Sequence, residues 1–346
     1  MLELRTTVLR APAGFSVRFR MRTLLVCLGC VLLALAVSVV AIGSGDYPMS
    51  PGEVVRTLLG GGTTADSFIV TDLRLPRVAT ALLAGAALAL SGAVFQTLVR
   101  NPLGSPDLLG FTQGSASGAL TAIMLGGGSA AVASGAVGGG ILTGLIIYAC
   151  AWRQGLHGSR LVLAGIGLAA VLTGVEGYLL TKADITDAAR AVLWITGSLD
   201  GRSWSDAVPL AIALAVLAPV VLGCSRALGM LELGDEAALA LGIRVGPLRT
   251  MSLLAAVLLC SFAAAAVGPV AFVALTAPQL ARRLTRSPGP NLLPALCVGM
   301  ALLVSADLLG QRLIPGRQLP AGVLTGALGG CYLIWLLASE RKAGRI

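Results

Sequence analysis

Long apolar runs separated by short polar segments fill the chain from residue 23 to residue 338. A helix needs about 20 mainly apolar residues to cross the hydrocarbon core of a bilayer. Ten runs approach this length, and they cover residues 23–43, 78–99, 108–126, 130–151, 161–181, 206–223, 248–267, 268–284, 292–311 and 319–338. The pattern predicts an all-α polytopic membrane protein of about ten transmembrane helices. A basic segment over residues 1–22 precedes them, and a short tail over residues 339–346 follows.

The composition agrees with this class. Hydrophobic residues make up 56% of the chain and charged residues 12%, whereas about 25% of the residues of a soluble domain are charged. The net charge is +9, and the basic residues lie in short segments between the apolar runs, without interleaved aromatic residues. A nucleic-acid-binding surface is therefore not indicated.

The basic residues predict the orientation. An even number of spans places both termini on the same side, and cytoplasmic termini put 17 of the 25 Lys and Arg residues on the cytoplasmic side. Cytoplasmic loops carry the excess of Lys and Arg. We therefore expect a multi-pass protein of the cytoplasmic membrane with both termini in the cytoplasm.

One polar stretch, residues 225–250, is too highly charged to lie in hydrocarbon. Within it, Asp235 is a suitable N-cap, Glu236 suits the positive end of a helix dipole, and Gly242 can take the left-handed position after the helix. A helix of about two turns needs support from its surroundings. It either rests on its own protein or docks into a groove of a soluble partner.

A second stretch, Asn101-Pro102-Leu103-Gly104-Ser105-Pro106, leaves the second apolar run with two prolines. Proline interrupts helices, so a stiff re-entrant turn is expected near the cytoplasmic face. We hypothesise that Asn101, Pro102 and Leu103 form a gate with Ser159 of the segment opposite.

Small residues recur within the second run at Gly85, Ala89 and Gly92. Such residues let helix backbones approach closely in a membrane. Between the seventh and eighth runs, Gly268-Pro269 predicts either a tight turn or a broken helix.

Several polar residues lie at or within the spans. Arg74 and Arg77 are either interfacial anchors or a cationic landing site for carboxylates of an outer partner. Glu176 and Gln96 are candidate polar residues of a pathway, and Glu176 with Asp307 leaves proton coupling as an alternative.

No motif for catalysis or energy supply is present on the chain. The two lysines, Lys182 and Lys342, do not belong to a phosphate-binding loop, and the single histidine, His157, excludes a histidine-rich metal site. We expect no cofactor, metal or catalytic residue on this chain. If ATP drives transport, it is hydrolysed with Mg²⁺ by another subunit.

A set of motifs in order resembles the FecCD permeases, which are membrane subunits of type II ABC importers for iron-siderophores, haem and cobalamin. The similarity runs from about the first apolar run to the C-terminus. Its motifs are L-R-L-P-R from Leu73, L-L-A-G-A-A-L-A-L-S-G-A-V-F-Q from Leu82, N-P-L-G-S-P-D-L-L-G from Asn101, G-D-E-A-A-L-A-L-G-I from Gly234, V-G-P-V-A-F-V-A-L from Val267 and Q-L-P-A-G-V-L-T-G from Gln318.

The resemblance implies a ten-helix subunit that works with a second permease, an ABC ATPase dimer and an extracytoplasmic binding protein. It implies that Arg74 and Arg77 meet the binding protein, and that Asn101 to Leu103 and Ser159 close the inner end of the pathway. The coupling region in the ATPase cleft would include Gly234, Asp235, Glu236, Ala237, Leu241 and Gly242.

The chain departs from the family pattern at two places. Pro278-Gln279 replaces a frequent proline-histidine pair, and Gln311 stands where an arginine is common, with Arg312 next to it as a candidate docking residue. The motifs are most similar to the second permease subunit of ferric-enterobactin systems, which implies a catecholate siderophore and a heterodimer.

Alternatives remain open at this point. The same importer class could carry haem or cobalamin, and a proton-driven secondary transporter would be a different class. A substrate-sensing receptor would need a cytoplasmic output domain, for which the C-terminal tail is too short.

Overall fold

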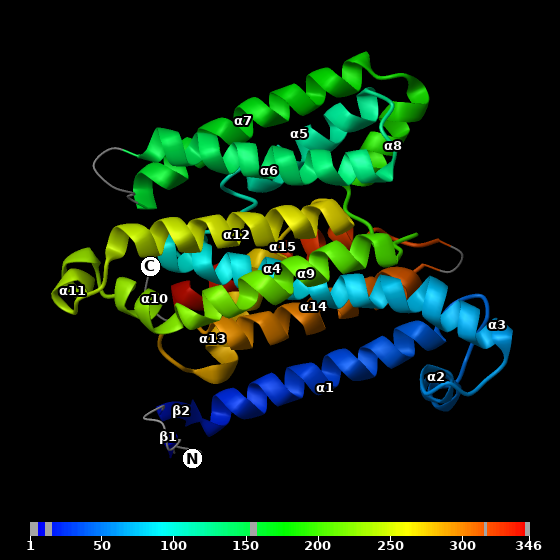
Figure 1. Cartoon of the computed structure of the whole chain (residues 1–346), viewed down its shortest axis with the longest axis horizontal. Coiled ribbons are helices and arrows are strands. Elements are labelled where there is room, and N and C mark those ends of the chain that lie inside the picture. Colours follow the sequence, from blue (N-terminus) through cyan, green and yellow to red (C-terminus); the bar gives the residue numbers. More distant parts are fainter. Residues whose placement is uncertain (1–5, 11–15, 153–157, 315–316, 343–346) are drawn as a thin grey trace.

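The computed structural model describes the chain except for residues 1–5, 11–15, 153–157, 315–316 and 343–346. His157 and the last part of the tail therefore lie outside the described residues. Ten of the described helices are 13 residues or longer, and each overlaps one predicted span (Figure 1). They are α1 (Met21–Gly43), α4 (Leu75–Val99), α5 (Phe111–Met124), α6 (Ser129–Ala151), α7 (Gly158–Lys182), α9 (Trp204–Gly223), α12 (Val245–Val267), α13 (Val273–Thr285), α14 (Leu292–Arg312) and α15 (Ala321–Lys342).

Seven helical segments of the described chain are long and apolar enough to cross a membrane. They contain α1, α4, α6, α7, α9, α12 and α14. Helices α5 and α13 have 14 and 13 residues, so each is only about 20 Å long against a hydrocarbon core of about 30 Å.

Shorter elements connect these helices. An antiparallel hairpin, β1 (Thr6–Arg10) with β2 (Ser16–Arg20), precedes α1, so the basic N-terminal segment has local structure that the apolar pattern did not predict. The others are α2 (Pro51–Leu58), α3 (Thr64–Ser67), the π-helix η1 (Phe68–Arg74), α8 (Ile185–Ile195), α10 (Ser225–Leu231) and α11 (Asp235–Ala240).

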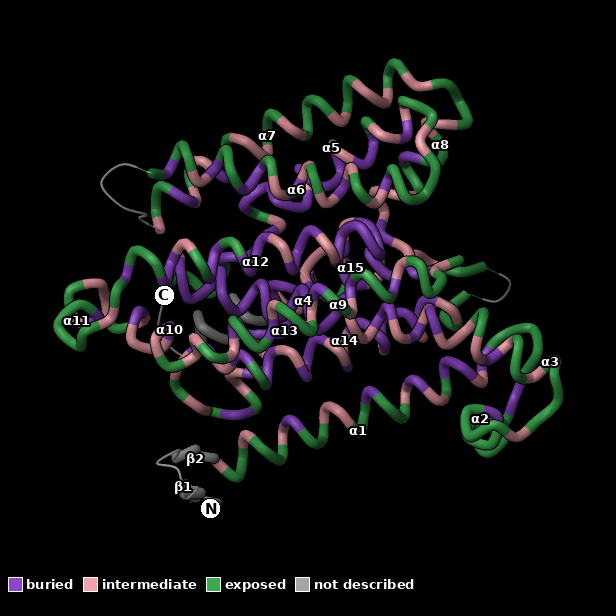
Figure 2. Tube along the Cα trace, in the orientation of Figure 1, coloured by how far each residue is buried: buried purple, intermediate pink, exposed green. Residues whose placement is uncertain are grey.

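Helix α4 lies at the centre of the bundle, and α12, α13 and α14 pack around it (Figures 1 and 2). The most apolar window of the segment that contains α4 is 83% buried, whereas that of α7 is only 11% buried. Helix α7 belongs to a layer with α5, α6 and α8 on one side of the molecule, and α1 covers α14 on the other side.

Glycines set the distances between α4 and its neighbours. A Cβ atom on Gly92 would lie 1.8 Å from the carbonyl oxygen of Ala274 in α13, and one on Gly85 would lie 2.3 Å from that of Gly299 in α14. Backbone approaches of this kind are what small residues permit in membranes. The predicted close-packing role of Gly85 and Gly92 is therefore confirmed.

The chain between α12 and α13 is a broken helix. Gly268 and Phe272 have positive φ angles of 77° and 67°, and α13 begins only at Val273. The predicted span over 268–284 therefore starts five residues too early, because the segment from Gly268 to Phe272 is not helical. Protein surrounds the break: a Cβ atom on Gly197 would lie 2.2 Å from the carbonyl oxygen of Pro269. Irregular backbone is tolerated at membrane depth when protein covers it.

Gly92→Ala is expected to destabilise the protein by more than about 3 kcal/mol, because the new methyl group meets a backbone carbonyl that cannot rotate away. Thermal unfolding in detergent measures the loss. Gly29→Ala on α1 is the matched control, since no atom lies within 4 Å of its added Cβ. Its helix propensity gain should leave stability unchanged or raise it by up to about 1 kcal/mol. Equal unfolding temperatures for the two variants would contradict the packing role of Gly92.

Candidate functional site

The polar stretch between α9 and α12 forms two short helices, α10 and α11, at one end of the bundle (Figure 1). Gly234 has φ 117° and takes the N-cap position of α11, so Asp235 is the first helical residue and makes no capping bond. The prediction of Asp235 as N-cap is therefore wrong, because its carboxylate pairs with arginines instead. Gly242 ends the segment with φ 82°, and its N–H donates to Leu239, as the sequence predicted.

Helix α11 rests on its own protein with one face and exposes the other. Ala238 is fully buried, while Glu236 is exposed. Three leucines around the helix are largely accessible: Leu233 at 71%, Leu239 at 59% and Leu241 at 58%. A charged segment that also exposes several large apolar side chains has the character of an interaction surface.

The Asp235 carboxylate binds two arginines from helices far apart in the sequence. Arg249 in α12 donates from Nη1 to Oδ2 at 2.8 Å and from Nη2 to Oδ1 at 2.7 Å. Arg100, the residue that follows α4, forms an ion pair with Oδ1. The Arg249 side chain is only 8% exposed, so this bidentate pair neutralises a charge near the end of a buried helix.

A second carboxylate joins the same segment to α13. Glu232, between α10 and α11, accepts a bond of 2.8 Å from Arg282. The Thr97 hydroxyl of α4 lies 3.5 Å from the same oxygen. Helices α4, α12 and α13 are thus all connected to the α10–α11 segment through acidic side chains.

The turn after α4 is held by side-chain bonds. Asn101 Oδ1 accepts from the N–H of Leu103 at 2.9 Å, which is an Asx-turn. Gln279 Nε2 in α13 donates to the carbonyl of Pro102 at 2.8 Å and lies 3.1 Å from Gln96 Oε1. Leu103 remains 44% exposed. The three predicted gate residues on this turn are therefore held in one conformation, and Gln279 contributes to holding them.

Ser159 lies close to this turn. A Cβ atom on Gly158 would be 3.1 Å from the Cα of Val99, so the start of α7 packs on the end of α4. Ser159, Arg100, Gly234, Glu236 and Ala237 line one open pocket of about 650 Å³. The structure thus brings predicted gate and coupling residues to a single site.

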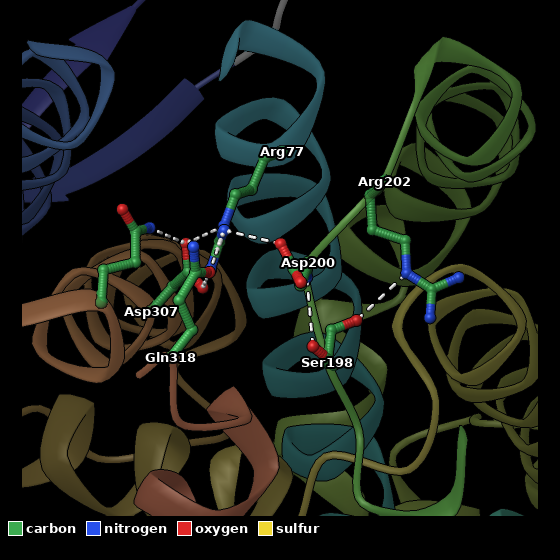
Figure 3. A network of polar contacts seen from close by, with 7 residues as sticks. Arg77, Ser198, Asp200, Arg202, Asp307 and Gln318 are labelled. Carbon is green, nitrogen blue, oxygen red and sulfur yellow. Dashed lines mark hydrogen bonds and ion pairs between the residues drawn. The ribbon is translucent and has the colours of Figure 1, made fainter. Parts of the chain in front are cut away.

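At the opposite end of α4, Arg77 is surrounded by acceptors (Figure 3). It donates to both carboxylate oxygens of Asp307 in α14 at 3.0 and 2.9 Å, and to Gln318 at 2.8 Å. The Asp307 side chain is 2% exposed and that of Arg77 is 14% exposed. Asp200, which is 66% exposed, covers the guanidinium from the solvent side at 3.3 Å.

Arg202 lies beside this cluster, after Asp200 (Figure 3). Burial lowers the pKa of its guanidinium, and the nearby carboxylates of Asp206 and Asp200 oppose that shift. Its Nε donates to the carbonyl of Ser198 at 3.1 Å, which ties together the short connection between α8 and α9.

The other docking candidates differ in accessibility. Arg74 donates to the carbonyls of Ile42 at 2.6 Å and Tyr47 at 2.8 Å, so it connects η1 to the end of α1. Arg312 is exposed. Its neighbour Gln311 donates to Asp307 at 2.8 Å.

The two candidate pathway residues lie in different surroundings. Gln96 is 2% exposed and donates to the carbonyl of Leu275 at 3.0 Å, so it connects α4 to α13 inside the bundle. Glu176 lies half-buried on the sparsely covered helix α7 and accepts a bond of 3.4 Å from Ser117.

Three residues of this site were not singled out from the sequence: Arg100, Arg249 and Arg282. Gln279 was noted only as a departure from the family pattern. A signal was present for Arg249, since an arginine at the start of an apolar run requires a partner. Its partner Asp235 lies only 14 residues away. The partner of Arg100 could not be identified from spacing, because the same carboxylate lies 135 residues from it in the sequence.

No group of His, Cys, Asp or Glu within the described parts of the chain could hold a metal ion. A family model described as the FecCD transport family matches residues 24–339. The ferric enterobactin transport system permease protein FepG of Escherichia coli (strain K12) is 42% identical over 93% of this chain and 98% of its own length. The Fe(3+)-citrate import system permease protein YfmE of Bacillus subtilis (strain 168) is 37% identical over 94% of this chain and 98% of its own.

A solved structure supports the same fold. An inward-facing conformation of a metal-chelate type ABC transporter aligns with a TM-score of 0.80 at 27% identity, covering 91% of this chain and 99% of that one. The family match spans nearly the whole chain and agrees with the helical architecture. This chain is a multi-pass protein of the cytoplasmic membrane and belongs to the FecCD transport family of ABC transporter permeases.

Proposed function

We propose that this chain is a permease subunit of an ATP-driven importer that moves a ferric siderophore across the cytoplasmic membrane. ATP is hydrolysed by partner subunits, and this chain receives the resulting movement through α11. The observation that carries the proposal is the position of α11. It presents exposed leucines at the end of the bundle while its first residue is ion-paired to the end of the central helix α4.

The proposed topology has ten transmembrane helices with both termini in the cytoplasm. The permease domain covers residues 23–338, and its coupling region covers residues 225–249. The distribution of Lys and Arg supports this orientation. In this orientation α11 faces the cytoplasm, where an ATPase is accessible.

The ATPase dimer docks on the exposed side of α11. Leu239 and Leu241 supply apolar contact area and Glu236 supplies charge on a helix whose buried side is fixed by Ala238. An amphipathic helix in a groove is a common mode of recognition. Gly234 precedes this helix and Gly242 follows it, and both have positive φ angles.

A second FecCD-type permease covers the open face of α7, which makes the transporter a heterodimer. An added Cβ on Gly167, Gly174 or Gly177 would meet no atom within 4 Å. Such small residues let a partner helix approach closely. The carboxylate of Glu176 beside them is then enclosed at an interface that can line the pathway.

The outer end receives a siderophore-binding protein. Arg312 is exposed and offers its charge directly, whereas Arg77 and Arg74 are already bonded within the chain. Arg77 contributes by holding Asp200 at the surface and does not offer a free positive charge.

The substrate is a catecholate siderophore similar to enterobactin. The similarity to FepG supports this choice over citrate, since the match to the ferric citrate permease is less close. Haem and cobalamin importers of the same class remain the alternative that a direct uptake measurement tests.

Glu236→Arg should leave membrane insertion intact and abolish both co-purification of the ATPase and iron-siderophore uptake, because a reversed charge faces the docking groove. Asp184→Arg is the matched control, because Asp184 is exposed and makes no side-chain capping bond. It directly precedes α8, which lies at the opposite end of the bundle from α11 (Figure 1). Normal uptake by the Glu236 variant would remove the coupling assignment.

Arg312→Glu should weaken the association with the binding protein by about tenfold, mainly through a slower on-rate at low salt, as expected for a rim charge. Surface-bound transporter in nanodiscs allows the rates to be measured. Lys182→Glu, at the end of α7, is a control that should not change them. Unchanged kinetics for both variants would exclude Arg312 from the docking surface.

The complete assembly in proteoliposomes should import an iron-55 catecholate complex only when ATP is supplied, and a pH gradient alone should give no uptake. Import driven by the pH gradient without ATPase would instead establish a secondary transporter, in which Glu176→Gln should stop transport. Import of haem or cobalamin but not the catecholate would correct the substrate.

A further inference from the structure

The ion pairs of Asp235 connect two parts of the chain. One is helix α11, for which we propose a movement, and the other is the turn after α4, for which we propose an opening. Arg100 has φ 54° and is the left-handed residue that ends α4. The next three residues are Asn101, Pro102 and Leu103, the candidate gate. The carboxylate of Asp235 is therefore paired with the residue directly before the gate.

The turn after Arg100 is stiff. The N–H of Asn101 donates to Gln96 and that of Gly104 donates to Asn101. Pro102 has a fixed φ angle, and Gln279 holds its carbonyl at 2.8 Å. A displacement of Arg100 is thus passed on to the gate turn with little local adjustment.

The two arginines around Asp235 have different roles. Arg249 is 8% exposed and binds the carboxylate in two places, so it fixes the start of α11 on α12. Arg100 is 39% exposed and extends from the end of α4. Helix α11 has few direct contacts with α4, so the Asp235–Arg100 ion pair is the defined connection between them.

We propose that the Asp235–Arg100 ion pair is the mechanical linkage between the coupling helix and the gate turn, with Arg100 as a positioning residue for transport. This linkage rests on the proposed function. When α11 is displaced by its ATPase, Asp235 pulls Arg100, and the Asn101–Leu103 turn moves with it.

The test is a double-mutant cycle in the complete importer reconstituted in proteoliposomes. Uptake of the iron-55 catecholate and ATP hydrolysis are measured together to give substrate imported per ATP. Arg100→Gln should keep ATP hydrolysis stimulated by the binding protein and reduce the import ratio about tenfold, within the usual range of coupling between sites. Asp235→Asn should reduce the ratio at least as much, and the double variant should match Asp235→Asn.

Two further variants exclude a merely structural effect. Arg100→Lys keeps the positive charge and should restore most of the import ratio. Arg286→Gln is the matched control, because Arg286 is also an exposed, left-handed residue at a helix end, with φ 48°. It has no ion pair among the described residues, so its import ratio should equal that of the unmodified assembly.

Three results would overturn the linkage: an unchanged import ratio in Arg100→Gln, losses that multiply in the double variant, or an equal loss in Arg286→Gln. Each requires that the unmodified assembly imports on ATP. If the unmodified assembly imports nothing on ATP, the proposed function fails, and the linkage fails with it.

Discussion

The structure depends on one constraint: a charged side chain inside the helix bundle must be paired with a group that compensates its charge. A buried charge that loses its partner costs about 3–5 kcal/mol, so a charged residue within the bundle needs an acceptor or donor nearby. Asp307 accepts hydrogen bonds from Arg77 and Gln311, and Arg249 is ion-paired with Asp235. The Arg77–Asp307 pair also determines which helices are connected, because it joins α4 to α14 across 230 residues of sequence.

Helix α4 unites the two ends of the molecule. Its 25 residues correspond to about 37 Å of helix, enough to cross a membrane. The cluster around Asp307 is attached at Arg77, near its first turn, and the ion pairs of Asp235 at Arg100, just after its last turn. A single buried helix thus connects the surface proposed for the binding protein with the surface proposed for the ATPase.

The sequence predicted the long helices well, because a segment that crosses the hydrocarbon core must be an apolar run of about 20 residues. It failed where local rules compete with distant partners. Asp235 is a suitable residue type for an N-cap, yet two arginines bind its carboxylate and Gly234 takes the N-cap position. The start of α13 was also misplaced, since an apolar stretch does not reveal that Phe272 adopts a positive φ angle.

The glycine contacts of α4 limit how the protein can move. A backbone carbonyl of α13 occupies the place where a side chain would lie at Gly92, and one of α14 does so at Gly85. Rotation of α4 about its own axis would drive neighbouring residues that carry a Cβ into these carbonyls. We therefore expect α4, α13 and α14 to keep their packing to one another when the protein moves, so that a displacement of one is shared by all three.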